Sequence, residues 1–316
     1  MDQSEDWKKF QHEVYEECKR VFNDAEEILE DTHIKGKFTK RSRQIDTLIK
    51  LNDNDIIAVD AKCYNKKVDV KEVESYIGML KDIGANKGIL ISNKGFSKAA
   101  INRAHFGESN FEVDILSLAN LDNFQGYGAI TYSGNYAVFI RPPFGWIVDG
   151  SQTGIAPALL YARGYDHEGA MKNNEWMYIN FWEKNDEIDT IDKLINHHNQ
   201  DNYDADEFAK IEHYNIEEIA IKKSKSKKYP TIEISAYRDL GDFILFGVLF
   251  CPDNLIERDI KKICFVLKNA SPMKITNPSI LTTKFSKGFL SSTSPGVNMK
   301  FKISPFSLQM RCSLNP

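Results

Sequence analysis

The sequence has no long hydrophobic run: none of its 316 residues lies in an apolar stretch of about 18 residues, the length that a membrane-spanning helix needs. The N-terminal segment MDQSEDWKKF is polar and has no apolar core of a secretion signal. From these two absences we expect a cytoplasmic protein that is neither inserted in a membrane nor secreted.

Paired cysteines and nucleotide-binding loops are also missing. No CxxC spacing occurs and the histidines have no metal-binding spacing, so the cysteines are expected to be free thiols in a reducing compartment rather than a zinc site. No glycine-rich loop of the Walker type occurs either, which argues against ATP-driven translocation by this chain. The five cysteines are Cys18, Cys63, Cys251, Cys264 and Cys312.

The chain carries no strong excess of charge, since its net charge is −4. This value argues against a protein coated with basic surface, but it permits a local site for nucleic acid. The most biased segment is the basic run IKKSKSKKYP at residues 221–230, for which we expect a solvated loop between two strands.

The length of the chain favours two domains, and 42% hydrophobic residues are enough for two cores. In the first third, apolar residues at helical spacing predict an amphipathic helix over residues 4–23, followed by an irregular or short strand segment. A hairpin, a helix stopped by Gly84, a strand, a helix capped by Ser97 and a last strand complete the pattern. We therefore expect a mixed α/β domain over residues 1–124.

The remaining two thirds read as a second α/β domain with a largely antiparallel sheet. A segment rich in glycine and tyrosine, FQGYGAITYSGNY, marks the boundary, and we expect a linker at residues 125–135. The second domain is expected over residues 136–270, and a C-terminal arm rich in serine, threonine, proline and lysine over residues 271–316. The predicted fold class is thus α/β (α+β) in both parts.

Charged residues interrupt the predicted hairpin, where they are costly: Asp46 lies on the first strand, and Asp60 and Lys62 lie on the second. Because side chains alternate between the faces of a strand, Asp60 and Lys62 share one face, and Ala61 points the other way. With a turn centred on Asp53, Asp46 falls directly opposite Asp60. One residue more or fewer in the turn would break this pairing.

Two opposed carboxylates repel each other, and a divalent cation between them removes the conflict. Hard oxygen ligands favour Mg²⁺ or Mn²⁺, with the backbone carbonyl of Ala61 as a third ligand. Such an ion can activate water and polarise a phosphodiester. Lys62 would orient or deprotonate the attacking water, or stabilise the charge of the transition state. The alternative is that these are solvated charges at the end of a hairpin.

The segments RQID and VDAK, followed by VESYIGMLKDIGANKGILISNKGFSKAAINRA, resemble the PD-(D/E)xK nuclease superfamily and are most similar to its Mrr-like restriction endonuclease branch. The resemblance covers about residues 7–121. It implies a restriction-endonuclease-like core, Asp46 and Asp60 as metal ligands, Lys62 as the catalytic lysine, and double-stranded DNA as the substrate. This chain departs from the pattern at Asp60, where glutamate or glutamine is more usual.

The same resemblance implies a glutamate on the first helix beside the metal. Gln11 stands near the aligned position, and Glu13 and Glu17 share a helix face at i, i+4. We take Glu13 as the expected catalytic residue and metal ligand, with a plain solvated helix face as the alternative.

Basic and aromatic residues flank both strands of the hairpin, where they could follow a phosphate backbone. The alternative is again a pair of solvated loops. The expected nucleic-acid-binding residues are Lys40, Arg41 and Arg43 before the first strand, and Tyr64, Lys66 and Lys67 after the second.

The second half is weakly similar to the Mog1/PsbP-like α/β/α sandwich, in the segments FIRPPFGWIVD, EWMYINFWEK and TIDKLI. No catalytic constellation is visible there, so we expect this domain to select the target, to sense a triggering ligand or partner protein, or to mediate assembly.

The combined interpretation is a Mg²⁺-dependent endodeoxyribonuclease of bacterial restriction or anti-phage defence, which acts as a homodimer because cutting both strands takes two sites. The alternatives are a non-catalytic nucleic-acid-binding module, and a sensor subunit whose partner does the cutting.

Overall fold

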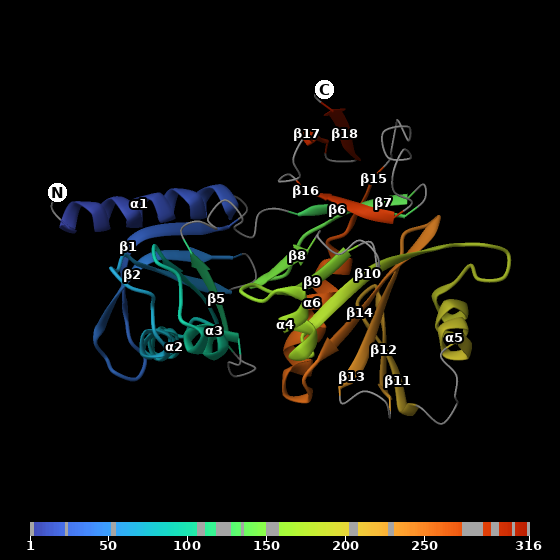
Figure 1. Ribbon diagram of the computed structural model, residues 1–316, viewed down its shortest axis with the longest axis horizontal. Coiled ribbons are helices and arrows are strands. Elements are labelled where there is room, and N and C mark those ends of the chain that lie inside the picture. Colours follow the sequence, from blue (N-terminus) through green and yellow to red (C-terminus); the bar gives the residue numbers. More distant parts are fainter. Residues whose placement is uncertain are drawn as a thin grey trace. The chain divides into compact units, whose positions relative to one another are not determined.

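The computed structural model divides the chain into two compact units, residues 1–126 and residues 127–316 (Figure 1). The residues that it describes are 3–22, 25–51, 55–105, 111–117, 128–133, 136–149, 158–201, 208–226, 231–273, 287–291, 297–304 and 307–314.

The first unit is built on a five-stranded mixed sheet with the strand order β1-β2-β3-β4-β5. The first three strands are antiparallel neighbours, whereas β3, β4 and β5 run parallel. This sheet, with its helices, is the mixed α/β domain that the sequence predicts. The strands are β1 (Glu27–Lys35), β2 (Ser42–Lys50), β3 (Ile56–Lys62), β4 (Lys87–Ser92) and β5 (Glu112–Ser117).

Strand β1 is longer than expected, because the sequence predicts only an irregular or short strand there. It spans nine residues and pairs with β2 along most of its length. As an edge strand it leaves most of its side chains exposed or half-exposed. It therefore lacks the apolar alternation from which a strand is predicted.

Helix α1 (Gln3–Val21) lies on one side of this sheet, and α2 (Val70–Ile83) and α3 (Lys98–His105) lie on the other (Figure 1). Asp69 caps α2 by accepting hydrogen bonds from two backbone amides of its first turn, and Gly84 ends it in the left-handed region at φ 77°. Ser97 accepts a hydrogen bond from the Ala100 amide at 3.2 Å, so the expected caps at Gly84 and Ser97 are both confirmed.

The largest sheet of the second unit has seven antiparallel strands in the order β11-β12-β13-β14-β10-β9-β8. Its two faces are covered differently, because alternate residues of β14 pack with α6 and with α5. The expected largely antiparallel sheet is confirmed. Its strands are β8 (Trp146–Asp149), β9 (Ala158–Ala162), β10 (Trp176–Glu183), β11 (Phe208–Ile216), β12 (Ile219–Ser226), β13 (Ile232–Asp239) and β14 (Phe243–Cys251), and the helices are α4 (His167–Lys172), α5 (Ile191–Asp201) and α6 (Ile256–Lys268), which follows the short 3₁₀ helix η2 (Asp253–Leu255).

Smaller sheets in the second unit include strands from the expected linker and from the expected C-terminal arm. Strand β6 (Ala129–Ser133) lies inside the expected linker 125–135, and it pairs with β7 (Tyr136–Ile140) and with β16 (Lys287–Ser291). The expected C-terminal arm also contains β15 (Ser271–Met273) and the hairpin of β17 (Val297–Ser304) and β18 (Ser307–Leu314). β6 thus pairs both with β7, its neighbour in the sequence, and with β16, which lies far away in the sequence.

The basic run at residues 221–230 was also misread as a loop. Its first part belongs to β12, and Lys222 is buried with 2% of its surface exposed. Burial lowers the pKa of Lys222.

No helix in the described parts of the chain is both long enough and apolar enough to cross a bilayer.

Candidate active site

The hairpin of β2 and β3 has the register that places the two aspartates opposite each other. The observed pairs run from Lys50 and Ile56 to Thr47 and Val59, and one further step along this register puts Asp46 opposite Asp60. The amide of Leu51 donates to the carbonyl of Asp55 at 2.9 Å, which closes the hairpin as expected. The turn residue Asp53 lies outside the described residues.

The ladder between β2 and β3 ends at Thr47 and Val59, so the backbone of Ala61 lies beyond its last paired residues. Because hydrogen-bonded and non-hydrogen-bonded pairs alternate in an antiparallel ladder, the N–H and C=O of Ala61 point towards β2, just beyond the last paired residues. The Asp46 carboxylate takes the place of the missing strand partner and accepts a hydrogen bond from the Ala61 amide at 2.8 Å. The Ala61 carbonyl faces the same edge and can serve as an oxygen ligand.

Asp60 and Lys62 form an ion pair on one face of β3, with Asp60 Oδ2 and Lys62 Nζ 2.8 Å apart. Burial and the neighbouring Asp46 charge raise the pKa of Asp60 to about 6, although Lys62 acts in the opposite direction. Burial lowers the pKa of Lys62, but the Asp60 carboxylate more than offsets this, so the pKa lies above its ordinary value. The lysine is therefore an ammonium ion at neutral pH.

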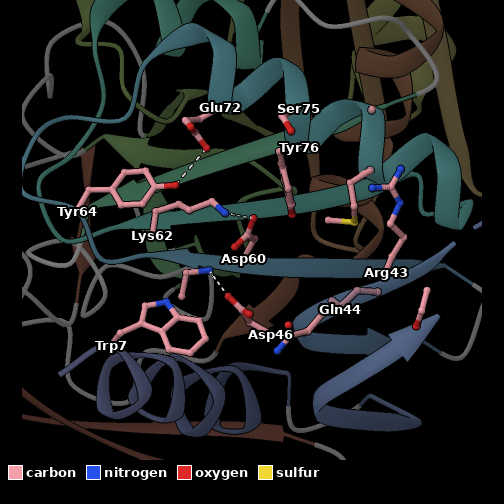
Figure 2. A pocket seen from close by; sticks show the side chains of 15 residues that line it. Trp7, Arg43, Gln44, Asp46, Asp60, Lys62, Tyr64, Glu72, Ser75 and Tyr76 are labelled. Carbon is pink, nitrogen blue, oxygen red and sulfur yellow. Dashed lines mark hydrogen bonds and ion pairs between the residues drawn. The ribbon is translucent and has the colours of Figure 1, made fainter. Parts of the chain in front are cut away.

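These groups line a pocket of about 630 Å³ at one end of the sheet. Figure 2 shows Trp7 beside α1 and Tyr64 beside Glu72 of α2, on the same side of the two carboxylates in this view. The Trp7 side chain is partly open to solvent, with 36% of its surface exposed. The lining residues are Trp7, Ser42, Arg43, Gln44, Ile45, Asp46, Asp60, Ala61, Lys62, Tyr64, Glu72, Ser75, Tyr76, Gly78 and Met79.

Helix α2 supplies the wall of the pocket through Glu72 and Tyr76. The Tyr64 hydroxyl donates to the Glu72 carboxylate at 3.2 Å (Figure 2). The Tyr76 hydroxyl is buried and lies within hydrogen-bonding distance of two backbone carbonyls, at 2.5 Å from Ala58 O and 3.1 Å from Ile89 O. It thereby fixes α2 against the parallel strands that carry the site.

Glu13 is not brought into this pocket. Its side chain is half-exposed and lies 4.0 Å from Lys9, an i, i+4 pair on the outer face of α1. The inner face of α1 carries Phe10 and Val14, which are buried against the sheet. Of this helix, Trp7 is the residue that reaches the pocket.

The expected nucleic-acid-binding residues are divided between the pocket and the surface around it. Arg43 and Tyr64 line the pocket, and Arg43 Nε donates to Asp82 at 2.7 Å. The others are exposed on the two flanking turns: Lys40, Arg41, Lys66 and Lys67.

The donors present fit a hard divalent cation that keeps most of its water. No cluster of three or more His, Cys, Asp or Glu side chains able to hold a metal occurs among the described residues. Mg²⁺ is commonly held by one or two carboxylates, with water and substrate phosphate completing the octahedron. Asp46, Asp60 and the Ala61 carbonyl form a set of this kind, and burial, with a smaller contribution from the Asp46 charge, raises the pKa of Asp60.

Several pocket residues were not predicted from the sequence. Trp7 was expected on the buried face of its helix, and Tyr76 carries no motif. Glu72 lies in the first turn of α2, where an acidic residue is already explained by the helix dipole. One feature of the sequence could have identified Glu72. Helix α2 starts just after β3, so its first turn must lie over the end of the sheet that carries Tyr64.

Comparison with known proteins gives a family match for the first unit. Residues 9–124 match the family model described as restriction endonuclease, of the Mrr catalytic type. No curated protein matches the chain.

Solved structures resemble parts of the chain at low similarity. A repair endonuclease from Pyrococcus abyssi is 19% identical with a TM-score of 0.26, and the match covers 37% of this chain and 48% of that one. The ATP-dependent Type ISP restriction-modification enzyme LlaBIII, bound to DNA, is 18% identical with a TM-score of 0.28, and the match covers 38% of this chain and 8% of that one. The present chain thus spans less than half of either protein.

The PsbP protein CyanoP from Synechocystis matches 47% of this chain over 93% of its own length, at 12% identity and a TM-score of 0.28. This is the PsbP likeness that the sequence predicts, found over part of the chain. For the first unit, the family match covers every pocket residue except Trp7, and residues 9–124 are similar throughout to restriction endonucleases of the Mrr type.

Proposed function

We propose that the first unit hydrolyses phosphodiester bonds of double-stranded DNA with the help of Mg²⁺ or Mn²⁺. The observation that carries this proposal is the convergence of Asp46, Asp60 and Lys62 in one pocket, two strands of a hairpin supplying the two acids. The restriction endonuclease match over residues 9–124 supports the same chemistry.

In this proposal the two carboxylates and the Ala61 carbonyl hold the ion. When bound, the ion polarises the scissile phosphate and lowers the pKa of a coordinated water. Asp46 is held in position by its hydrogen bond from the Ala61 amide, so its free oxygen is oriented before substrate arrives.

Lys62 acts beside the carboxylates. Its side-chain nitrogen, 2.8 Å from the Asp60 carboxylate, is placed to orient or deprotonate the attacking water, or to stabilise the charge of the transition state. Tyr64 and Glu72 limit the space around the ammonium group on the α2 side.

The test is cleavage of plasmid DNA by the full chain with Mg²⁺ or Mn²⁺, and with chelator as the blank. Asp60→Asn and Lys62→Met are expected to lower the rate by about 100- to 1,000-fold, the usual cost of removing a group that stabilises transition-state charge. Glu13→Gln is the matched control, because this glutamate is half-exposed outside the pocket, and its activity should equal that of the wild type. Retained cleavage in both pocket variants would reject the proposal.

We also propose that the protein serves bacterial restriction or antiviral defence as a cytoplasmic homodimer, with the second unit sensing a ligand or partner. The support is the restriction endonuclease family of the first unit, and the need for two sites to cut two strands. Sedimentation of the protein with and without DNA tests the dimer, and a monomer that cuts both strands in one encounter would overturn it.

A further inference from the structure

A rigid turn next to the pocket presents an exposed phenylalanine among basic residues. We call residues 36–41, which join β1 to β2, the Phe38 turn. The amide of Gly36 donates to the carbonyl of Arg41 at 2.8 Å, and the amide of Lys40 donates to the carbonyl of Gly36 at 3.2 Å. The backbone of Lys40 is left-handed at φ 61°, which closes the turn.

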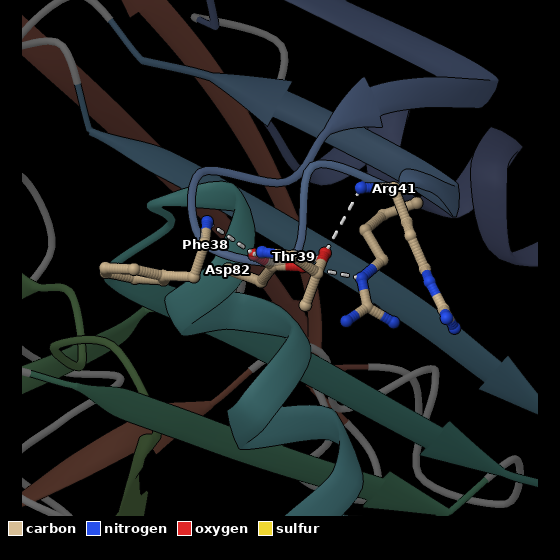
Figure 3. A network of polar contacts seen from close by, with 5 residues as sticks. Phe38, Thr39, Arg41 and Asp82 are labelled. Atoms are coloured by element: carbon tan, nitrogen blue, oxygen red, sulfur yellow. Dashed lines mark hydrogen bonds and ion pairs between the residues drawn. The ribbon is translucent and has the colours of Figure 1, made fainter.

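Asp82, in the last turn of α2, fixes the Phe38 turn from below (Figure 3). Its carboxylate accepts hydrogen bonds from the amides of Phe38 and Thr39, each at 3.0 Å, and from the Thr39 hydroxyl at 2.5 Å. The Asp82 carbonyl also accepts from the Lys37 amide at 2.6 Å. The Thr39 hydroxyl and amide lead the interactions that hold the pKa of Asp82 well below its ordinary value, so the carboxylate stays charged.

The close approach of Asp82 requires glycine at position 36. A Cβ at Gly36 would lie 2.6 Å from the Asp82 carboxyl carbon, closer than such atoms approach. Since Asp82 is 3% exposed and fully engaged, it has no other position to take. The turn is thus held in one conformation before any partner binds.

Phe38 projects from this fixed turn into solvent. Its backbone amide points at Asp82 while its ring extends away from the network (Figure 3). It is 77% exposed, whereas the other exposed large hydrophobic residues in the described parts of the chain lie between 36% and 43%. The ring is thus both solvated and presented by a backbone held in place by Asp82, so a partner could bind it without ordering the turn.

The charges around Phe38 indicate what that partner is. Protein interfaces are depleted in lysine, whereas DNA-binding surfaces use lysine and arginine for phosphate contacts. Apolar side chains that enter the minor groove between base steps are flanked by such contacts. The exposed basic residues next to Phe38 in the sequence are Lys35, Lys37, Lys40 and Arg41.

Arg43 connects the Phe38 turn to the pocket. It lines the pocket and donates to Asp82, the residue that holds the turn. Ser42 to Asp46 on β2 then lead from the turn to the carboxylates within one strand. The Phe38 turn and the carboxylates therefore belong to one continuous stretch of chain, and we take a duplex bound at Asp46 and Asp60 to extend along β2 to Phe38.

We propose that the Phe38 turn is a DNA wedge, which inserts the Phe38 ring between base steps of the substrate duplex beside the cleavage site while its basic residues contact phosphates. This inference rests on the proposed nuclease function and adds the element that grips and bends the duplex. Unstacking a base step bends the duplex, so binding and bending are both expected to depend on the ring.

The test measures binding of the full chain to a labelled duplex by fluorescence anisotropy in Ca²⁺, and bending by energy transfer between dyes on its two ends. Phe38→Ala is expected to weaken binding by about tenfold and to abolish the bend, and Phe38→Trp to keep both, because stacking needs only a planar ring. Phe265→Ala is the matched control, since Phe265 is an exposed phenylalanine of the second unit, and it should bind as the wild type does.

Salt dependence separates the ring from its basic neighbours. Arg41→Ala should reduce the slope of log affinity against log salt concentration by about one, whereas Phe38→Ala should leave the slope unchanged, because only the arginine releases counterions.

Equal binding and bending by Phe38→Ala, in a protein whose wild type cleaves DNA, would overturn the wedge alone. A wild type that neither binds nor cleaves DNA would overturn the nuclease function itself. A change of oligomeric state in Phe38→Ala with unchanged DNA binding would show that the ring covers another protein copy, and the wedge would again be wrong.

Discussion

The Asp46 carboxylate accepts a hydrogen bond from the Ala61 amide at 2.8 Å, so an acidic side chain of β2 replaces the strand partner that the ladder lacks at this point. One group thereby satisfies a backbone donor and orients a carboxylate beside Asp60. The same bond makes the site sensitive to how Asp46 is replaced, and not only to whether it is replaced.

Asp46→Asn should separate the charge of this residue from its hydrogen bond. The amide oxygen of asparagine can still accept from Ala61, so stability should stay within about 0.5 kcal/mol of the wild type while cleavage is lost. Asp46→Ala leaves the Ala61 amide without this acceptor and should cost about 1–2 kcal/mol. Urea unfolding and plasmid cleavage measure the two effects, and wild-type cleavage by Asp46→Asn would contradict the role of its charge.

Mn²⁺ binding should be visible through Trp7, because this indole lines the same pocket as the two carboxylates. A paramagnetic ion quenches fluorescence at short range, so Mn²⁺ should quench the Trp7 emission, and excess Mg²⁺ should restore it. Trp7→Phe should remove the quenching, whereas Trp176→Phe, a change in the second unit, should keep it. Asp60→Asn should weaken the Mn²⁺ response by tenfold or more, and quenching that survives in Trp7→Phe would place the ion elsewhere.

The register of the hairpin could be predicted from the sequence, because it depends on the number of residues in one short turn. Counting outward from residue 53 gives the register that the observed ladder follows as far as Thr47 and Val59, one step before Asp46 and Asp60. The two ends of α2 are also determined by residues next to them in the sequence. Asp69 caps the first turn, and Gly84 takes up the left-handed conformation that other residues avoid. Features fixed within a few residues of chain are the ones that sequence patterns describe.

The position of α1 relative to the pocket could not be predicted in this way. Periodicity identifies the apolar face of the helix, but the contact of the helix with the sheet decides which of its residues lies over the edge that carries Asp46 and Asp60. Val14 packs inward, so Glu13, about 100° away around the helix, turns outward, while Trp7 reaches the pocket. The Phe38 turn was hidden for a similar reason, because Asp82 lies more than forty residues away in the sequence.

Gly36→Ala should destabilise the first unit, and Gly78→Ala should stabilise it. The new methyl at position 36 would collide with the engaged Asp82 carboxylate, for an expected cost of about 1–3 kcal/mol. Position 78 lies inside α2 with no atom within 4 Å of the added Cβ, and alanine there should gain about 0.5–1 kcal/mol. Urea midpoints compare the two variants, and a neutral Gly36→Ala would show that the Phe38 turn is not held rigidly by Asp82.

A buried cluster of charges in the second unit should make the stability of that unit depend on pH. Glu175 is 1% exposed and pairs with Arg258, and its other carboxylate oxygen accepts no hydrogen bond from the described residues. Burial raises the pKa of Glu175 from 4.5 to about 7, with Arg258 and Lys262 acting against this shift and Asp259 adding to it. Cys251 and Tyr165 also face the same carboxylate.

The sign of the effect follows from the protons bound in each state. Between pH 4.5 and about 7 the folded state keeps a proton on Glu175 that the unfolded chain has released, so stability falls as the pH rises through this window. The slope is at most about 1.4 kcal/mol per pH unit. Glu175→Gln mimics the protonated form and should flatten the dependence, whereas Glu187→Gln, at an exposed position of the same unit, should not. Urea unfolding at pH 5, 6 and 7, followed by tryptophan fluorescence, measures the slope, and an unchanged slope in Glu175→Gln would assign the titration to another group.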